Sequence, residues 1–306
     1  MTRHLTRREW HRLVLGGLGA SALASTARGA EKKIDSRFQG VLIGAQSYSF
    51  RDRPVDKAIE AYVAVPLGEA ELWQGHVEPR PDDARFQQMS AAEKAESREK
   101  LRKWRLETPL SHFHEIGDRF RAAGVDLYAY NYSFQDNFTD PEIDRGFEMA
   151  KALGAKVITA SANQKTVPRI AAAAARHKMR VGMHNHSRID PNEFATAEDL
   201  EKAMAASEWI CTNLDIGHFT AANQDAVGFL RKHHDRIVTL HIKDRKKNQG
   251  DNMVFGEGDT PIKEVLAVLK QNKWPIPANI EYEYKGADPG EEVRRCLDYC
   301  KKALGS

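Results

Sequence analysis

Residues 210–244, ICTNLDIGHFTAANQDAVGFLRKHHDRIVTLHIKD, contain two apolar runs rich in β-forming residues, at 210–215 and 237–242. Between them a helical pattern runs from Asp225, a residue type that favours helix starts, to Arg231. The first run ends at Asp215, and the second leads into His241–Asp244. A strand, a helix and a second strand in this order predict a β-α-β unit with parallel strands.

The alternation of strand and helix extends from this unit in both directions, beginning at residue 41. Further strands are predicted at 41–46, 69–73, 125–130, 156–160, 180–184 and 278–284, and further helices at 140–153, 166–177, 196–207 and 262–272. Eight strand–helix units within about 265 residues predict an α/β fold, the (β/α)8 TIM barrel. The alternative is a doubly wound sheet, but no glycine-rich nucleotide loop follows the first strand.

One connection is too long for a simple barrel loop. Residues 75–110 follow the second predicted strand and include a charged helical stretch at 91–105. We interpret them as an insertion over the barrel mouth, within a single domain of residues 31–306. Two interpretations of this insertion stay open, because it either covers the substrate or is a solvated surface excursion.

The first thirty residues have the layout of an export signal. Arg7 and Arg8 precede an apolar run from Leu13 to Ala24, and small residues follow to Ala30. The run of 12 residues is too short to cross a bilayer, so no stable membrane anchor is predicted. Paired arginines before a weakly apolar core resemble a cleaved twin-arginine signal, which implies the twin-arginine export machinery and a periplasmic or otherwise exported protein. The alternative is an amphipathic N-terminal helix of the fold.

Composition and charge narrow the class of protein. Hydrophobic residues make up 41% and charged residues 29% of the chain, which excludes a disordered or collagen-like protein. Without the first 30 residues, 41 basic and 42 acidic residues remain, so general nucleic-acid binding is not expected. The three cysteines form neither a disulfide framework nor a Cys-x-x-Cys zinc motif. A homo-oligomer is compatible with the sequence.

Polar residues end the last four predicted strands. In a barrel these ends line the active site. The four strand ends are Met183–His186, Leu214–His218, Leu240–Asp244 and Ile280–Glu283. Carboxylates and imidazoles together favour zinc, manganese or iron over calcium, and the absence of thiolates excludes structural zinc classes. Alternation along a strand places Glu281 and Glu283 on one face, and likewise His241 and Lys243. The other interpretation is that Asp215, His241 and Glu281 are ordinary polar residues of a barrel mouth.

At these residues the sequence resembles the sugar phosphate isomerase/epimerase superfamily, with its xylose isomerase-like barrel, and in particular the inosose dehydratase branch. The resemblance covers about residues 38–303 and rests on Asp-x-Gly-His at 215–218, His-Ile-Lys-Asp at 241–244 and Ile-Glu-Tyr-Glu at 280–283. The family binds one divalent metal ion through ligands from the fifth to the eighth strand. The resemblance implies Asp215, His241 and Glu281 as three of these ligands, and Mn, Zn, Fe or Co as the metal. From the residues alone, Glu281 and Glu283 are alternatives for holding it, because they are two residues apart on one strand face.

The fifth strand departs from the family pattern. Where the family's epimerases and dehydratases usually have a glutamate, this chain offers His184, Asn185 and His186, and no acid occurs until Asp190. His184 or His186 could bind the metal through nitrogen, whereas Asn185 offers only a weak carbonyl oxygen. Of these alternatives we place His184 with the ligands and Asn185 with the substrate contacts. Because the family's epimerases exchange protons between two metal-bound glutamates, a site without one of them cannot follow that scheme unchanged.

The resemblance implies removal of a proton from a carbon next to a carbonyl, with the metal stabilising the enediolate. Glu281 or Glu283 is the candidate base, and His186 and His218 return a proton, bind a hydroxyl or support the site. Lys243 neutralises oxyanion charge or contacts the substrate. From the early strands Gln46, Glu71 and His76 are expected to line the pocket, although Glu71 is equally a candidate for a structural ion pair.

The resulting hypothesis is an exported, metal-dependent sugar isomerase, epimerase or lyase that acts on a sugar, a cyclitol or a keto-glycoside. Two alternatives of other classes stay open. One is a nuclease of the endonuclease IV type, which uses three zinc ions and needs a basic face. The other is a sugar-binding barrel without catalysis.

Overall fold

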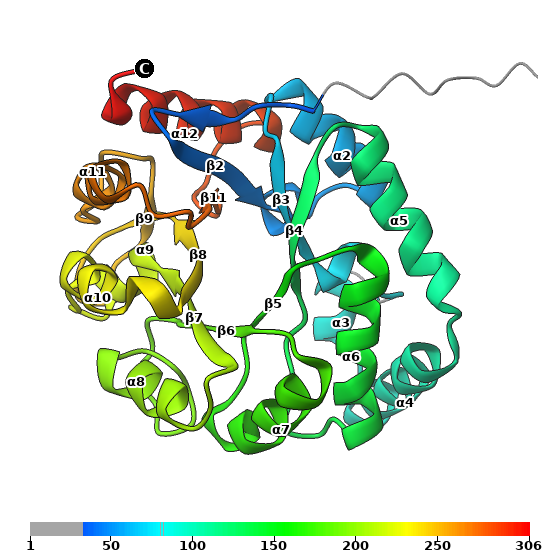
Figure 1. The fold of residues 1–306 in the computed structure, drawn as a ribbon. Helices are drawn as coiled ribbons and strands as arrows, with labels where there is room; N and C mark the ends of the chain where they lie inside the picture. Colours follow the sequence, from blue (N-terminus) through cyan, green and yellow to red (C-terminus); the bar gives the residue numbers. More distant parts are fainter. Residues whose placement is uncertain (1–32, 80, 82) are drawn as a thin grey trace, which may run out of the picture. The chain divides into compact units, whose positions relative to one another are not determined.

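The computed structural model describes residues 33–79, 81 and 83–306, so the predicted export signal at 1–30 lies outside the described residues. Within the compact unit Lys32–Ser306, parallel strands form a closed ring surrounded by helices (Figure 1). The ring closes because β2 pairs in parallel with both β3 and β11. Its strands are β2 (Val41–Gln46), β3 (Glu69–Trp73), β4 (Asp126–Asn131), β5 (Val157–Ala160), β6 (Val181–His184), β7 (Ile210–Asp215), β8 (Ile237–Ile242) and β11 (Ala278–Ile280). The predicted TIM barrel is confirmed.

Each barrel strand is followed by an outer helix of the barrel, with further helices after β3 and β7. The outer helices are α2 (Val55–Ala64), α5 (Leu110–Ala122), α6 (Asp140–Leu153), α7 (Val167–His177), α8 (Ala197–Ala205), α10 (Ala226–His233), α11 (Ile262–Asn272) and α12 (Pro289–Leu304). Sequence signals set their limits: Thr139 caps α6 in a capping box with Glu142, and Gly154 ends it with a φ of 82°. Asp225 caps α10, as predicted.

Shorter elements complete the unit. The helix α9 (Ile216–Ala221) follows β7 directly, and 3-10 turns occupy Ser47–Phe50, Gln74–His76, Gln164–Thr166 and His234–Arg236. Strand β1 (Arg37–Phe38) pairs antiparallel with β2, and β9 (Asp244–Arg245) pairs with β10 (Asn252–Met253) beside the barrel mouth. Among the described residues, none of the helices combines the length and the apolar character that a bilayer crossing requires.

The last barrel strand is shorter than predicted, because it ends at Ile280 and not at residue 284. After the Glu281 amide, which donates to the Ile242 carbonyl, the backbone leaves the ladder. The Tyr282 amide donates to Ser49 Oγ at 2.9 Å, and Arg51 donates to the Tyr282 carbonyl at 3.0 Å. Side chains therefore replace strand partners from this point onward.

The insertion after β3 contains α3 (Asp83–Gln88) and α4 (Ala91–Glu107), and α4 packs against α6. Arg105 of α4 is buried and donates two hydrogen bonds to Glu78, at 2.6 and 2.9 Å. Its other partner is Glu142 at the start of α6, 3.4 Å away. The described part of the insertion helps to line a separate cavity of about 410 Å³. It contributes no residue to the cavity at the barrel centre.

Candidate metal centre

Four side chains meet at the carboxyl ends of neighbouring barrel strands. His184 ends β6, Asp215 ends β7, His241 lies near the end of β8, and Glu281 follows β11. All four are buried, and one ligand atom from each lies within 4.8 Å of those of the others. Parallel strands point their carboxyl ends to one face of a barrel, which explains why residues so distant in sequence converge. The structure thus brings together the four residues predicted as metal ligands.

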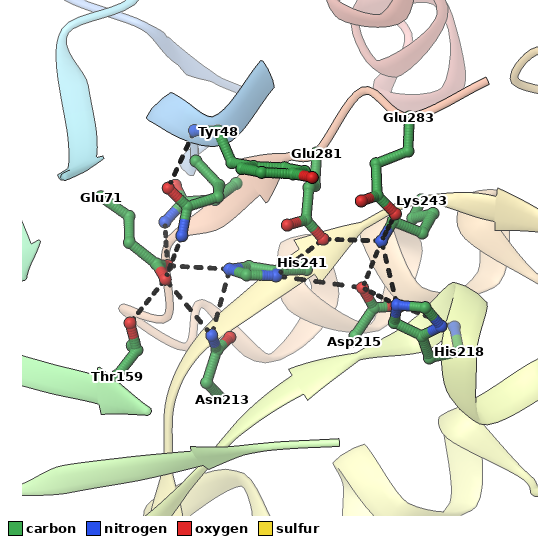
Figure 2. A network of polar contacts seen from close by, with 12 residues as sticks. Tyr48, Glu71, Thr159, Asn213, Asp215, His218, His241, Lys243, Glu281 and Glu283 are labelled. Carbon is green, nitrogen blue, oxygen red and sulfur yellow. Dashed lines mark hydrogen bonds and ion pairs between the residues drawn. The ribbon is translucent and has the colours of Figure 1, made fainter. Parts of the chain in front are cut away.

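The ring of His241 lies between the carboxylate of Glu71 on one side and those of Glu281 and Asp215 on the other (Figure 2). Its Nδ1 is 3.1 Å from Glu281 Oε2 and 3.9 Å from Asp215 Oδ2, so this nitrogen faces the ligand cluster. The Nε2 atom faces away from the cluster and lies 3.0 Å from Glu71 Oε2. Burial lowers the pKa of His241, but the charges of Glu71 and Glu281 outweigh burial and hold it well above its usual value.

Lys243 brings a positive charge to the same carboxylates. Its Nζ lies 2.6 Å from Glu283 Oε2, 2.8 Å from Glu281 Oε2 and 3.3 Å from Asp215 Oδ2 (Figure 2). Burial alone lowers the pKa of this ammonium, yet the surrounding carboxylates raise it above its usual value. The contacts with Lys243 and His241 likewise hold the pKa of Glu281 well below its usual value despite burial. Glu281 and Glu283 both reach Lys243, as expected for two side chains on one face, although both lie beyond the end of β11 and not within a strand.

Two atoms of the cluster are buried and make no hydrogen bond within the described part of the chain. They are His184 Nδ1 and Asp215 Oδ2, each of which carries a lone pair. Buried polar atoms without partners are rare and costly. Burial, with the neighbouring His241 and His186, holds the pKa of His184 well below its usual value, which leaves the imidazole neutral and able to bind a cation. The two imidazoles and two carboxylates therefore fit a divalent metal ion.

A cavity of about 290 Å³ opens directly above the cluster. Of the predicted substrate contacts and proton carriers, Gln46, His186, His218, Lys243 and Glu283 line it. His218 lies between two cationic side chains, with Nε2 3.1 Å from Lys243 Nζ and Nδ1 2.7 Å from an Arg245 nitrogen. Burial and the charge of Lys243 hold the pKa of His218 well below its usual value. A cavity of this size is at the small end of the range for small-molecule sites.

Three predicted pocket residues lie elsewhere. Glu71 is fully buried beneath the cavity, and Asn185 is buried behind the cluster, where it holds the Asp215 backbone through two hydrogen bonds of 2.9 and 3.0 Å. His76 contacts Ser47 Oγ at 2.9 Å and the Phe50 carbonyl at 3.2 Å, away from the cavity. The expectation that these three line the pocket is corrected, because each is turned toward protein groups.

The sequence reasoning missed most of the cavity wall that comes from the early strands. Tyr48 and Trp73, whose rings meet edge to face at 4.9 Å, line one side. Asn131, Ser133 and Ser161 follow or end β4 and β5 and also line the cavity. The rule that strand ends line a barrel mouth applies to them as well, but single Asn and Ser residues resemble ordinary loop residues.

The chain is similar to sugar-processing barrels. The model of the family described as xylose isomerase-like TIM barrel matches residues 76–303. L-ribulose-5-phosphate 3-epimerase UlaE from Salmonella paratyphi C is 25% identical over 199 residues, which span 62% of this chain and 66% of that enzyme. The chain therefore aligns with slightly less than two thirds of the length of this curated relative.

Solved structures show the same fold at lower identity. The 3-keto-D-glucoside 4-epimerase YcjR from E. coli matches with a TM-score of 0.61 and 13% identity, over 86% of this chain and 99% of that chain. The probable 3-DHS dehydratase AsbF from Bacillus anthracis matches with a TM-score of 0.57 and 15% identity, over 86% and 98%.

Proposed function

Because this chain belongs to the xylose isomerase-like TIM barrel family, we propose that it is an exported, metal-dependent sugar isomerase, epimerase or lyase. The observation that carries the proposal is the buried cluster of His184, Asp215, His241 and Glu281 directly below a cavity with further carboxylate and imidazole groups. Among the described residues, His184 Nδ1 and Asp215 Oδ2 make no hydrogen bond, although Lys243 lies 3.3 Å from Asp215 Oδ2, and these atoms support a metal site.

The proposed chemistry is removal of a proton from the carbon next to a carbonyl. His184, Asp215, His241 and Glu281 would hold a divalent ion, which when bound would supply charge stabilisation to the developing enediolate. Glu283 is our candidate for the base, because it lines the cavity but does not belong to the ligand cluster. Lys243 donates to Glu283 at 2.6 Å and so fixes the direction of this carboxylate. His186 and His218 also line the cavity and are placed to return a proton or bind a hydroxyl.

The cavity favours an uncharged substrate. Among the described residues that line it, Lys243 is the one side chain with a permanent positive charge, and three carboxylates already surround its ammonium. Phosphate groups in proteins are bound by arginine or lysine side chains or by helix N-termini. We therefore propose an unphosphorylated sugar, cyclitol or keto-glycoside, in contrast to the sugar phosphate in the name of UlaE.

The ligand at β6 bears on which product forms. With His184 in this position, the cluster lacks a carboxylate on the β6 side and has Glu281 on the β11 side. A proton exchange between a β6 carboxylate and Glu281 then lacks its β6 partner, which favours β-elimination over that form of epimerisation. Isomerisation, epimerisation and elimination share the first step, so a test of that step examines all three.

Export is the second part of the proposal, and it rests on Arg7-Arg8 and the apolar run that follows. Fractionation of the producing cell tests it directly. We expect the mature chain outside the cytoplasm, and an Arg7→Lys, Arg8→Lys double variant in the cytoplasm with residues 1–30 still attached. Equal export of both forms would refute a twin-arginine signal.

Metal analysis of the purified protein is the first test of the centre. We expect about one Mn, Zn, Fe or Co per chain, and its loss in Asp215→Ala. About three zinc ions per chain would point to the nuclease, whereas no metal after incubation with divalent ions would leave a sugar-binding barrel.

The loaded protein is then incubated with keto-sugars and 3-keto-glycosides in D₂O. Deuterium entering the carbon next to the carbonyl, observed by NMR, is the expected result. Binding of these sugars without exchange would contradict catalysis.

A further inference from the structure

The carboxylate of Glu71 is the meeting point of side chains from several barrel strands. Glu71 itself lies on β3 and is fully buried. Its Oε1 accepts from Thr159 at 2.5 Å and Gln46 at 2.9 Å, with Asn213 at 3.4 Å. Its Oε2 lies 3.0 Å from His241 Nε2 and accepts from Asn279 at 3.3 Å. The five partners come from β5, β2, β7, β8 and β11, so this carboxylate ties most of the barrel together beneath the cavity.

The contact with His241 decides which nitrogen of the ring faces the ligand cluster. Two side chains meet the Nε2 atom of His241, each at 3.0 Å: the carboxylate of Glu71 and the amide nitrogen of Asn213. Because the charged carboxylate is the stronger partner and only accepts, it favours a proton on Nε2. The Nδ1 atom then points at Glu281 and Asp215, 3.1 and 3.9 Å away. A carboxylate that holds the remote nitrogen of a ligating histidine fixes its tautomer and orientation and raises its basicity.

The contact with Gln46 reaches the cavity itself. Gln46 lines the cavity, donates through Nε2 to Glu71, and accepts the Tyr48 amide through Oε1 at 3.2 Å. Tyr48 also lines the cavity. Glu71 therefore orients one group of the ligand cluster and one group of the cavity wall at the same time (Figure 2).

We propose that Glu71 is the positioning residue of this centre: it sets the Nδ1 atom of His241 toward the metal and holds Gln46 toward the substrate. The inference rests on the proposed metal-dependent function. Glu71 is not one of the four clustered ligand candidates and does not line the cavity. Its effect on metal and substrate binding therefore passes through His241 and Gln46.

Glu69 provides a matched control on the same strand. It is two residues earlier, on the same inward face, and equally buried. Glu69 packs against Gly44, where a Cβ would lie 1.7 Å from Glu69 Oε2. Among the described residues, no hydrogen bond or ion pair joins Glu69 to His241. Burial, together with the charge of Glu71, raises the pKa of Glu69 well above its usual value, and Glu69→Gln keeps the size and shape of this side chain.

The test compares the full-length protein with Glu71→Gln and Glu69→Gln in chelator competition for Zn²⁺ and Co²⁺. We expect Glu71→Gln to weaken both affinities by about 10–100-fold, and Glu69→Gln to change them less than about threefold. The thermal midpoints of the metal-free variants, measured alongside, separate a loss of fold from a loss of affinity. Equal affinities for the three proteins, or equal losses in both variants, would overturn the proposal.

A second readout does not need the metal. The ring protons and nitrogens of His241, observed by ¹⁵N NMR in the metal-free protein, should show a hydrogen-bonded Nε2 proton in the parent and in Glu69→Gln. In Glu71→Gln we expect this signal to shift upfield or to exchange with water. If the parent binds no metal, the proposed function fails, and this spectrum alone decides whether Glu71 orients the ring; an unchanged Nε2 signal in Glu71→Gln refutes that role.

Discussion

Two clusters of charged side chains in this protein differ in how many of their polar atoms find a hydrogen-bond partner. In the insertion, Arg102 and Arg105 face Glu78 and Glu142, so two cationic side chains meet two carboxylates. Arg105 binds Glu78 through two parallel hydrogen bonds, the geometry that suits a guanidinium and a carboxylate. No atom of these four side chains is among the buried groups without a hydrogen bond in the described chain. This cluster holds α4 against α6, and although it lines the cavity of about 410 Å³, each of its carboxylates already faces a guanidinium.

The cluster at the barrel mouth has the opposite character. Its carboxylates and imidazoles converge within 4.8 Å, yet His184 Nδ1 and Asp215 Oδ2 keep lone pairs without a hydrogen bond in the described part of the chain. The comparison teaches that burial and charge alone do not mark a functional site. What distinguishes the barrel mouth is that three carboxylates share the single ammonium of Lys243, and that two imidazoles belong to the same cluster.

The largest effect is expected for Glu283→Gln at the barrel mouth. If Glu283 is the base, exchange of the substrate proton with solvent falls by about 10²–10⁴-fold, the usual contribution of a positioned acid or base. The metal content should stay at the parent value, since Glu283 is outside the ligand cluster. Deuterium incorporation measured by NMR, with metal analysis of the same sample, checks this; loss of metal in Glu283→Gln would make Glu283 a ligand instead.

In the insertion, Arg105→Met should act on stability alone. The substitution leaves Glu78 and Glu142 buried without this cation, a change that typically lowers the free energy of unfolding by about 3–5 kcal/mol. Denaturant unfolding measures it, and Lys57→Met on the exposed face of α2 is a control that should change little. We expect added Zn²⁺ or Co²⁺ to shift the parent and Arg105→Met equally. A metal-dependent rescue of Arg105→Met would erase the distinction between the two clusters.

Lys243→Met makes the same kind of change at the barrel mouth and should have the opposite metal dependence. Without metal, the loss of a buried cation among Asp215, Glu281 and Glu283 should destabilise the protein by a similar amount, about 3–5 kcal/mol. A bound divalent ion replaces the missing charge, so most of this loss should be recovered with Zn²⁺ or Co²⁺ present. Thermal unfolding of the parent and of Lys243→Met, with and without metal, measures this recovery. If metal does not restore the stability of Lys243→Met, the ion binds elsewhere.

The sequence predicted much of the barrel because strands and helices alternate with clear hydrophobic periods. All eight barrel strands were predicted within a residue or two of their observed limits, except that β11 ends at Ile280. The convergence of Asp215, His241 and Glu281 followed from the rule that strand ends share one face.

Other parts of the site depend on contacts that no local pattern encodes. Nothing in Glu69-Ala70-Glu71 shows that both acids are fully buried and that Glu71, unlike Glu69, meets partners from distant strands. Tyr48 and Trp73 form a wall only because two short turns, at Ser47–Phe50 and Gln74–His76, lie side by side at the mouth. The anchoring of the insertion through Arg105 likewise needs Glu142, which lies 37 positions later in the chain.

The smallest effect is expected behind the barrel-mouth cluster, at Asn185. Its side chain holds the backbone of Asp215 from both sides, accepting from the amide at 2.9 Å and donating to the carbonyl at 3.0 Å. Asn185→Ala should lower the free energy of unfolding by about 1–3 kcal/mol, because two buried backbone groups lose their partner. Since Asp215 is a ligand candidate, metal affinity should fall as well. The Michaelis constant for a sugar substrate should stay unchanged when the metal site is fully occupied. If the Michaelis constant of Asn185→Ala rises while the metal site is fully occupied, Asn185 contacts the substrate after all. The cavity wall would then extend closer to β6 than the structure shows.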